Sequence, residues 1–334
     1  MMWNWTISAL ATGCTIVLYD GSPTHPSPAT LFNLCDNEGI SVLGISAKFL
    51  SVAQQAQVTP RISHQLSSLR AVLSTGSPLT EEGFNYVYSA IKSDCHLASM
   101  SGGTDIVSCF MLGNPNLPVY AGELQCAGLG MAVEVWDETG EALSEGKGEL
   151  VCTQSFPACP IGFWNDPDQV RFKQAYFDVF PGVWVHGDYA SHTAQDGYII
   201  YGRSDATLNP GGVRIGTAEI YSLLDAMPEI ADAVCVGQQW QDDTRVVLFV
   251  VMAPGHTLTE AFRETIKRHI REHASPRHVP AKILSVTDVP RTLSGKVAEL
   301  AVRQTLQGET IGNASALANS EILAEYHNRP ELRD

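Results

Sequence analysis

Hydrophobic and polar positions follow two different periods along the first 125 residues. Residues 15–19, 42–45 and 71–74 are short apolar runs beside turn-forming residues, which predicts buried strands. Residues 84–91 carry apolar side chains at the spacing of an amphipathic helix. Strands that alternate with helical patterns are typical of α/β layers around a parallel sheet, and we expect that arrangement here.

The pattern becomes rich in strands and glycines between residues 131 and 201. Apolar runs at 131–136, 149–153, 184–185 and 198–201 predict short strands. We expect a β-rich subdomain that continues the preceding α/β layers.

A third pattern begins at about residue 204 and predicts the order β-α-β-β-α. Helices are expected at 219–226 and 260–273, with strands at 233–236 and 245–252. These elements are enough for a small α+β domain with a core of its own.

The pattern therefore divides the chain into three parts. We expect a large α/β domain over 1–204 and a small α+β domain over 205–312. After about residue 308 the chain turns polar, with Asn, Ser and Ala, so 313–334 is predicted to form a loosely ending tail.

Composition fits this organisation, because 44% hydrophobic and 17% charged residues are typical of folded globular proteins. The net charge of −15 argues against a general attraction to nucleic acid or to anionic membranes. An anionic ligand would have to be held by a few local Arg and Lys residues. Oligomeric state is left open by the sequence.

Eight cysteines are spread along the chain without a Cys-x-x-Cys pair or zinc-like His/Cys spacing. Reduced cysteines explain this pattern better than a disulfide framework, which stays the alternative. The apolar opening lacks the basic start of a signal peptide, and no run of ~20 apolar residues could span a bilayer. We therefore expect a cytoplasmic protein.

The segment 99–105 combines glycines with polar side chains. Gly102 and Gly103 would let backbone approach a ligand closely, and Thr104 supplies a hydroxyl. Asp105 could hold a hard cation such as Mg²⁺. A polar loop that closes a strand explains the same residues equally well when the segment is read by itself.

Asp188 follows the strand predicted at 184–185. A rigid, ionised carboxylate in that place can accept hydrogen bonds from two ribose hydroxyls. The alternative is a turn aspartate that caps the loop before Asp196.

Two arginines and an aspartate mark the passage into the small domain. Arg203 can donate to ribose or phosphate, and Arg214 can reach a phosphate after the turn at 211–212. Asp205 lies where the β-rich pattern ends, which makes it a candidate hinge. Surface ion pairing is the alternative for either arginine.

Lys296 follows Ser294 and Gly295 near the end of the small domain. A lysine on such a loop is a compact point charge, and we expect it to be mobile enough to swing into a site. Most exposed lysines have no chemical role, so this residue does not decide the function by itself.

In order and spacing, these four segments resemble the motif series of the adenylate-forming superfamily of acyl-CoA synthetases, firefly luciferases and peptide-synthetase adenylation domains. GGTD at 102–105 stands in place of the family's TE motif, and HGD at 186–188 in place of TGD. GRSD at 202–205, VRIGTAEI at 213–220 and SGK at 294–296 complete the series.

Further runs are similar to the acetyl-CoA and acetoacetyl-CoA synthetase branch, and the likeness covers essentially the whole chain. They include MMWNW, LYDGSP, LSTGSPL, SGGTDI and PRHVP. The resemblance implies that 1–204 is part of a large AMP-binding domain and 205–312 a small mobile C-terminal domain. It also implies a phosphate loop that would precede this sequence, so the chain corresponds to a C-terminal half, as a natural truncation or an incomplete gene model.

The resemblance implies ATP-dependent ligation of acetoacetate to coenzyme A through an acyl-adenylate, with AMP and diphosphate released. A propionyl or medium-chain ligase, or a truncated inactive isoform or pseudoenzyme, is the alternative. Lys296 would be catalytic, bridging the carboxylate and the α-phosphate, and Asp105 would hold Mg²⁺. The residues implied for ATP and AMP are Gly76, Ser77, Pro78, Gly103, Thr104, Asp188, Arg203 and Arg214.

For the second step, the resemblance implies that the small domain rotates about Asp205. Gly212 would let the pantetheine arm of CoA pass, and Arg271 would meet a CoA phosphate. Gly102 would widen the acyl pocket, because the acetyl-CoA branch carries a tryptophan at the matching position.

Overall fold

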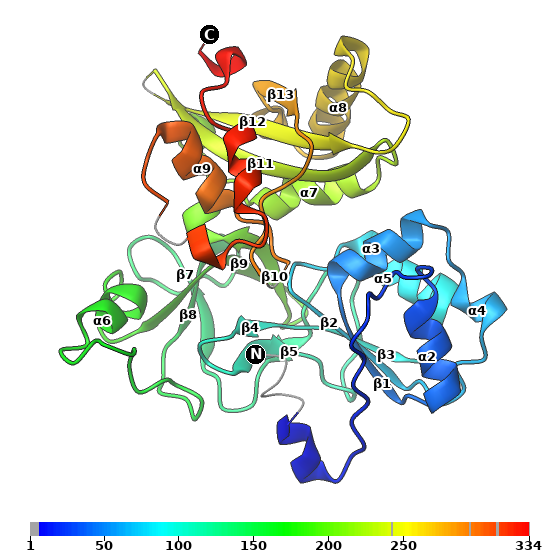
Figure 1. The fold of residues 1–334 in the computed structure, drawn as a ribbon. Coiled ribbons are helices and arrows are strands. Elements are labelled where there is room, and N and C mark those ends of the chain that lie inside the picture. Colours follow the sequence, from blue (N-terminus) through cyan, green and yellow to red (C-terminus); the bar gives the residue numbers. More distant parts are fainter. Residues whose placement is uncertain (1–6, 242, 294, 312–313, 334) are drawn as a thin grey trace. The chain divides into compact units, whose positions relative to one another are not determined.

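The computed structural model describes residues 7–241, 243–293, 295–311 and 314–333 (Figure 1). The contacts divide the chain into two compact units, Met1–Ile200 and Tyr201–Asp334.

The first unit begins with the expected parallel sheet. Strands β1 (Val42–Ser46), β2 (Ala71–Thr75) and β3 (His96–Ser99) lie in the order β1-β2-β3, and both neighbouring pairs are parallel. Buried apolar side chains join this sheet to its helices, including Phe32, Leu50, Val72, Phe84 and Leu97. The helices that flank the sheet in Figure 1 are α2 (Thr30–Glu38), α3 (Ala47–Gln55), α4 (Pro60–Ser63) and α5 (Glu81–Tyr86), which a π-helical turn (Val87–Ile91) continues.

The helix expected at 84–91 starts three residues earlier, because Thr80 caps it. The Thr80 hydroxyl accepts the Gly83 amide at 3.2 Å, which satisfies a donor that the first helical turn leaves unpaired.

The strand predicted at 15–19 is wrong. These residues are irregular in the structure, and Leu18 is 65% exposed. Within the described residues no strand pairs with this segment, and an apolar run becomes a strand only where a partner satisfies its amides and carbonyls. A short 3₁₀ turn (Leu10–Thr12) precedes it, and the MMWNW run at 1–5 lies outside the described residues.

The β-rich region holds two sheets. One has the order β4-β5-β6, with strands at Ser101–Gly103, Ser108–Leu112 and Cys126–Ala127. The other has the order β10-β9-β8-β7, with strands β7 (Val133–Trp136), β8 (Lys147–Cys152), β9 (Trp184–His192) and β10 (Tyr198–Arg203). Strand β8 pairs antiparallel with both β7 and β9.

Aromatic side chains join these sheets to helix α6 (Val170–Tyr176). The rings of Tyr176 and Trp184 stack with centroids 3.7 Å apart, and Phe156 meets the edge of Trp184 at 5.3 Å. Buried aromatic contacts of this kind hold the start of β9 in place.

The second unit is built on the sheet β11-β12-β13, in which β11 and β12 are antiparallel and β12 and β13 parallel. Its strands are β11 (Ile230–Trp240), β12 (Asp243–Met252) and β13 (Lys282–Ser285). The α-helices are α7 (Thr217–Asp225), α8 (Glu260–His273) and α9 (Glu299–Gln307), and 3₁₀ turns lie at Ser204–Ala206, Pro210–Gly212 and Pro276–His278. The expected α+β arrangement and the bounds of the helix at 260–273 are confirmed.

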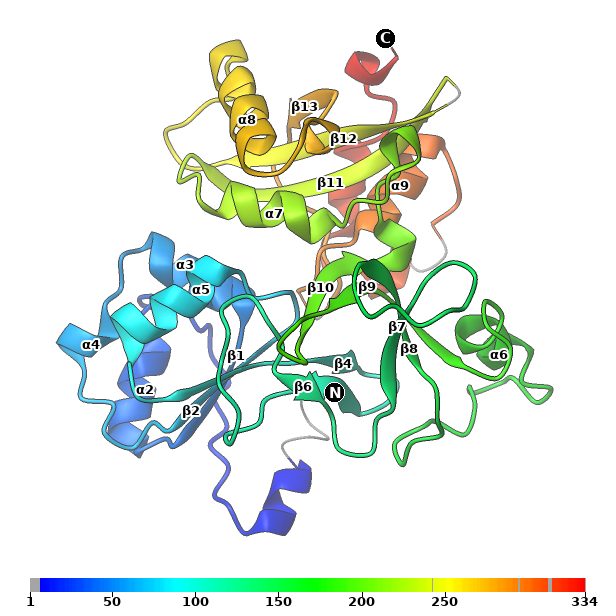
Figure 2. The same cartoon turned by 180° about the vertical axis from the view of Figure 1, so that it is seen from behind.

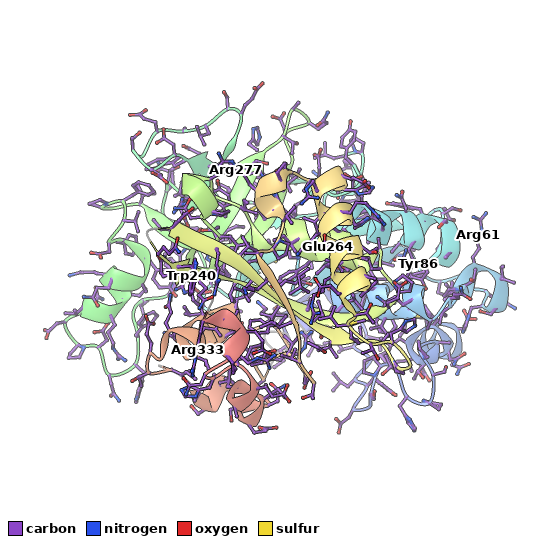
Figure 3. All side chains as sticks on the ribbon, turned by 90° about the horizontal axis from the view of Figure 1, so that it is seen from above. Arg61, Tyr86, Trp240, Glu264, Arg277 and Arg333 are labelled. Atoms are coloured by element: carbon purple, nitrogen blue, oxygen red, sulfur yellow. The ribbon has the colours of Figure 1, made fainter. Side chains whose placement is uncertain are left out.

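Both faces of this sheet are covered, which explains why its strands are nearly continuous in apolar residues. Cys235 faces a core formed with α7 and α8, whereas Val234 and Val236 face a core formed with α9 and the C-terminal segment. Figure 2 shows α7 on the side opposite α9. In Figure 3, Glu264 marks α8 on one side of the sheet and Arg333 marks the C-terminal segment on the other.

The prediction of a loosely ending tail at 313–334 is wrong. Short 3₁₀ turns form at Ala314–Ala316, Ser320–Glu325 and Pro330–Leu332. Leu323 and Tyr326 are buried against the α9 face of the sheet. A few apolar residues in a polar segment are enough to attach it, because burial of each large side chain contributes roughly 1.5–3 kcal/mol.

No helix among the described residues combines the length and the apolar character needed to cross a membrane. The eight cysteines are all free. Burial raises the pKa of the Cys35 thiol to about 11, so that side chain stays protonated at neutral pH.

Candidate functional site

Two of the predicted segments follow neighbouring parallel strands. Gly76, Ser77 and Pro78 are exposed directly after β2, and the 99–105 segment follows β3. The Thr75 hydroxyl donates to the Met100 carbonyl at 3.0 Å, which ties the two strand ends together. The carboxyl edge of a parallel sheet is where ligands commonly bind, and both segments lie there.

Gly102 packs directly against β5. A Cβ added to Gly102 would lie 2.1 Å from the Ser108 carbonyl oxygen and 2.6 Å from Cys109 Cα. The pairing register of β4 and β5 shifts between Ser101 and Gly102, which accompanies this close approach. Glycine is therefore required here by strand packing, a structural reason that is separate from the predicted acyl pocket.

Gly103 brings the two glycine-containing motifs together. A Cβ on Gly103 would lie 1.8 Å from Asp105 Oδ1 and 2.9 Å from His186 Cε1. The lack of a side chain thus leaves room for a carboxylate from one motif and an imidazole from the other. Thr104 and Asp105 are exposed in the turn after β4.

The Asp105 carboxylate accepts the Tyr176 hydroxyl at 2.6 Å. A carboxylate has about four acceptor positions, so this bond leaves capacity for a cation. No group of three or more His, Cys, Asp or Glu residues in the described parts of the chain could enclose a metal. The remaining acceptor positions of Asp105 suit a hard cation that takes most of its ligands from other groups.

Asp188 lies inside β9, which corrects the expectation that it follows a strand and excludes the turn-cap alternative. Its side chain is largely buried, and its Oδ2 lies 3.8 Å from Nε2 of His186. The two side chains meet where β9 departs from regular pairing with β8: the register shifts between Val185 and Tyr189, and Gly187 has a φ of +82°. The His186 ring also meets the edge of Phe110, with centroids 4.6 Å apart.

His186 and Tyr176 received no role from the sequence. The only signal for His186 was its nearness to Asp188 in the sequence, and the irregular backbone at Gly187 is what brings the two side chains together. Tyr176 is 71 residues from Asp105 in sequence, and no local pattern connects the two.

In the second unit, Arg203 and Asp205 form an ion pair. Arg203 Nε lies 3.7 Å from Asp205 Oδ1, and both side chains are half-exposed. The Asp205 carbonyl accepts a bond of 2.6 Å from Arg303 on α9. The backbone of the candidate hinge is thus hydrogen-bonded to α9 of the small domain. The surface ion pair that was the alternative role for Arg203 is present.

The loop at 210–212 is held from two sides. Both carboxylate oxygens of Asp243 accept the Gly211 amide at 3.0 Å, and Arg277 Nη1 donates to the Pro210 and Gly211 carbonyls at 3.3 and 3.2 Å. Hydrogen bonds from the Thr244 and Gly211 amides, with the charge of Arg277, lower the pKa of Asp243.

The two glycines of this loop differ. Both have positive φ, +58° for Gly211 and +75° for Gly212, which favours glycine. A Cβ on Gly211 would lie 2.7 Å from Arg277 Nη1, whereas one on Gly212 would meet nothing within 4 Å. Gly212 is therefore the open position, as the predicted passage for pantetheine requires. Arg214 is exposed just after the loop, and Arg271 is exposed in the last turn of α8.

Lys296 is exposed on the return side of a short hairpin. Its carbonyl accepts the Thr292 amide at 2.8 Å, and its amide donates to the Thr292 hydroxyl at 3.1 Å. These bonds shape the turn that presents the lysine, and its mobility stays a prediction. Its side chain still reaches solvent, and Ser294 lies outside the described residues.

Two protein-family models match the chain. The family model described as AMP-binding enzyme matches residues 1–156, and the AMP-binding enzyme C-terminal domain matches residues 219–296. The chain belongs to the AMP-binding enzyme family. Family membership and the mixed α/β fold with a small C-terminal domain are thereby confirmed.

Relatives in this family match the chain from end to end. An acetoacetyl-coenzyme A synthetase of Rhizobium meliloti (strain 1021) is 56% identical over 333 residues, covering 100% of this chain and 51% of that protein. The acetoacetyl-CoA synthetase of Mus musculus is 50% identical over 336 residues, covering 100% and 50%. The chain spans about half the length of the curated relatives it matches.

Solved structures of related enzymes are also similar to the chain. Acetoacetyl-CoA synthetase from Streptomyces lividans matches with a TM-score of 0.90 and 42% identity, covering 97% of this chain and 50% of that one. An anthranilate CoA ligase with bound anthranoyl-AMP matches with a TM-score of 0.73 and 20% identity, a likeness in fold alone. The roles given to individual residues stay predictions.

Proposed function

We propose that this protein functions in the ATP-dependent ligation of acetoacetate to coenzyme A. Acetoacetate would attack the α-phosphate of ATP and release diphosphate, and the CoA thiol would then displace AMP from the acyl-adenylate. The observation that carries the proposal is the 56% identity, over the whole chain, to a protein named for acetoacetyl-CoA synthesis.

The first step brings a carboxylate anion to a polyanion, so its main need is positive charge at the α-phosphate. We assign this charge to the exposed ammonium of Lys296, with Arg214 on the phosphates. Mg²⁺ would neutralise phosphate charge when bound, and the free acceptor capacity of Asp105 supports its role as ligand.

Nucleotide binding falls to the strand-end segments of the first unit and to β9. The exposed residues Gly76, Ser77 and Pro78 are suited to adenine and phosphates, and Gly103 and Thr104 to the phosphates. Asp188 and Arg203 are assigned to the ribose hydroxyls. Burial supports this role for Asp188, because a rigid acceptor binds two hydroxyls without ordering a flexible side chain.

The second step needs a different set of groups, which supports a hinge at Asp205. The open space at Gly212 suits the narrow pantetheine arm, and exposed Arg271 suits a CoA phosphate. Gly102 keeps its proposed place at the acyl pocket, although its missing side chain would point at the backbone of β5.

The proposed partners are the small molecules acetoacetate, ATP and CoA, with no role for nucleic acid. The cytosol is the proposed location, supported by the absence of a membrane-crossing helix among the described residues and by eight free cysteines.

Acid-dependent ATP–diphosphate exchange tests this proposal. The chain and the product of its complete reading frame are assayed side by side with acetoacetate, acetate, propionate and butyrate. Exchange that acetoacetate supports best, and that Lys296→Ala abolishes, is expected. If another acid supports exchange better, that acid replaces acetoacetate as the proposed substrate. If no acid supports exchange, the result favours the alternative of an inactive isoform.

A further inference from the structure

The C-terminal segment pairs with the chain that leads to Lys296. Leu317 forms an antiparallel bridge with Thr292, the Leu293 amide donates to the Ala316 carbonyl at 2.9 Å, and the Ala318 amide donates to the Arg291 carbonyl at 2.8 Å. In Figure 1 this red segment runs beside the orange chain that enters α9. We call residues 316–319 the strap.

The other side of the same chain forms the lysine hairpin. Arg291 bridges Val297, the Ala298 amide donates to the Pro290 carbonyl at 2.9 Å, and the Thr292 amide donates to the Lys296 carbonyl at 2.8 Å. Residues 290–293 are therefore central, with the strap on one side and residues 296–298 on the other. A two-stranded hairpin is marginal by itself in water, and a third strand makes such a ribbon stable.

One side chain closes the strap onto the hairpin. Asn319 Oδ1 accepts the Arg291 amide at 2.9 Å. Its Nδ2 donates to the Asp288 carboxylate at 2.8 Å and to the Val289 carbonyl at 3.0 Å. The amide of Asn319 thus bonds the Asp288 side chain and the backbone of Val289 and Arg291, groups that would otherwise turn to water.

The strap is itself attached to the core of the small domain. Tyr326 is fully buried, and its hydroxyl donates to the Asp288 carbonyl at 2.8 Å. The Glu325 carboxylate accepts the Thr287 amide at 2.9 Å. Arg291 adds a tie from the hairpin itself, since it donates to the Gly295 carbonyl at 2.7 Å and pairs with Asp232 on β11. The core therefore holds the hairpin by two routes, through the C-terminal segment that contains the strap and through the pair of Arg291 with Asp232.

We propose that the strap, closed by Asn319, fixes the hairpin that presents Lys296, and that Asn319 is a positioning residue for the adenylation step. Its effect on catalysis rests on the proposed function of Lys296. The strap contacts neither substrate in this assignment, so it acts through the hairpin backbone.

Hydrogen–deuterium exchange of the purified chain tests the strap without any need for activity. Asn319→Asp removes the amide donor and sets a second carboxylate against Asp288. The double variant Asp288→Asn/Asn319→Asp exchanges the two groups and restores a donor–acceptor pair. Ser320→Ala, at an exposed neighbouring position, is the matched control.

The amides of Thr292 and Ala298 are expected to exchange roughly tenfold faster in Asn319→Asp, the effect of losing one or two net hydrogen bonds. Exchange in β11 and α8 should stay unchanged, the double variant should recover most of the protection, and the control should match wild type. Unchanged hairpin exchange, equal acceleration throughout the small domain, or no recovery in the double variant each overturns the proposal.

A second measurement addresses the catalytic role. In Asn319→Asp the kcat of acetoacetate-dependent ATP–diphosphate exchange should fall, while thioester formation from supplied acetoacetyl-adenylate stays at the wild-type rate. Equal loss of both half-reactions contradicts a positioning role for adenylation. Absence of exchange in the wild type refutes the proposed function, whereas the hydrogen-exchange comparison still decides whether the strap holds the hairpin.

Discussion

Asp243 holds Gly211 in its left-handed conformation, because both carboxylate oxygens accept the Gly211 amide at 3.0 Å. Asp243 begins β12, so a residue of the central strand sets the loop that contains Gly212. Arg277 holds the carbonyl side of the same loop. Two oppositely charged side chains thus define a turn that is otherwise exposed.

Asp243→Ala should loosen this loop without unfolding the domain. The Gly211 amide can turn to water, so the loss of stability should stay at about 1 kcal/mol or less. Exchange of the Gly211 amide should accelerate, and the KM for CoA in thioester formation should rise while ATP–diphosphate exchange is kept. Glu309→Ala, an exposed carboxylate outside the loop, is the control. A KM for CoA equal to that of wild type would show that the loop does not meet the thiol substrate.

Lys296→Ala should remove acetoacetate-dependent ATP–diphosphate exchange by roughly a hundredfold or more, the usual loss when one group that stabilises transition-state charge is deleted. CoA attack on supplied adenylate should persist. The melting temperature should not change, because the side chain is exposed, and Lys173→Ala serves as an exposed control. Equal loss of the two half-reactions would contradict the role given to Lys296.

Gly102→Ala should destabilise the first unit by about 1–3 kcal/mol, because the new methyl group would overlap the Ser108 carbonyl. Gly44→Ala is the matched control: a Cβ there meets nothing within 4 Å, so this change should be neutral or stabilise by up to ~1 kcal/mol. Urea unfolding of both variants measures the difference. The same overlap means that Gly102→Trp must be tested for folding before any shift of preference towards acetate is interpreted.

Burial raises the pKa of Glu299, which starts α9 and accepts bonds from Thr217 and Tyr221 at 3.4 and 3.2 Å. A carboxyl with a raised folded-state pKa favours the folded state most below its unfolded pKa of about 4.3, and this contribution is lost as pH rises through the folded value.

Glu299→Gln cannot ionise, so this variant should be more stable than wild type at pH 7, by a margin that shrinks as pH falls. Urea unfolding across pH measures the margin, with Glu309→Gln as the exposed control. A margin that grows towards acid would refute the prediction.

Local signals were sufficient for much of the fold. The helix at 260–273 has the predicted bounds because both its apolar spacing and its Thr259 cap lie within one short segment of sequence. The strands at 42–45 and 71–74 were likewise predicted from short apolar runs. The motifs were also recognised from local sequence, and their order indicated the family.

The errors came where a partner distant in sequence decides the structure. Residues 15–19 have the composition of a strand, yet no strand of the described chain pairs with them. Asp188 was expected after a strand because the polar residues that follow Val185 interrupt the apolar pattern, whereas β9 continues to His192 and the His186 ring packs against Phe110.

By itself, the sequence determined the family and the candidate residues, since these depend on side-chain identity and spacing along the chain. Tertiary structure alone decided that Gly102 faces the backbone of β5, that Asp105 meets Tyr176, and that residues 316–319 hold the Lys296 hairpin. Each of these contacts joins groups that folding brings together, and a hydrogen bond or a steric limit between them exists only at that short distance.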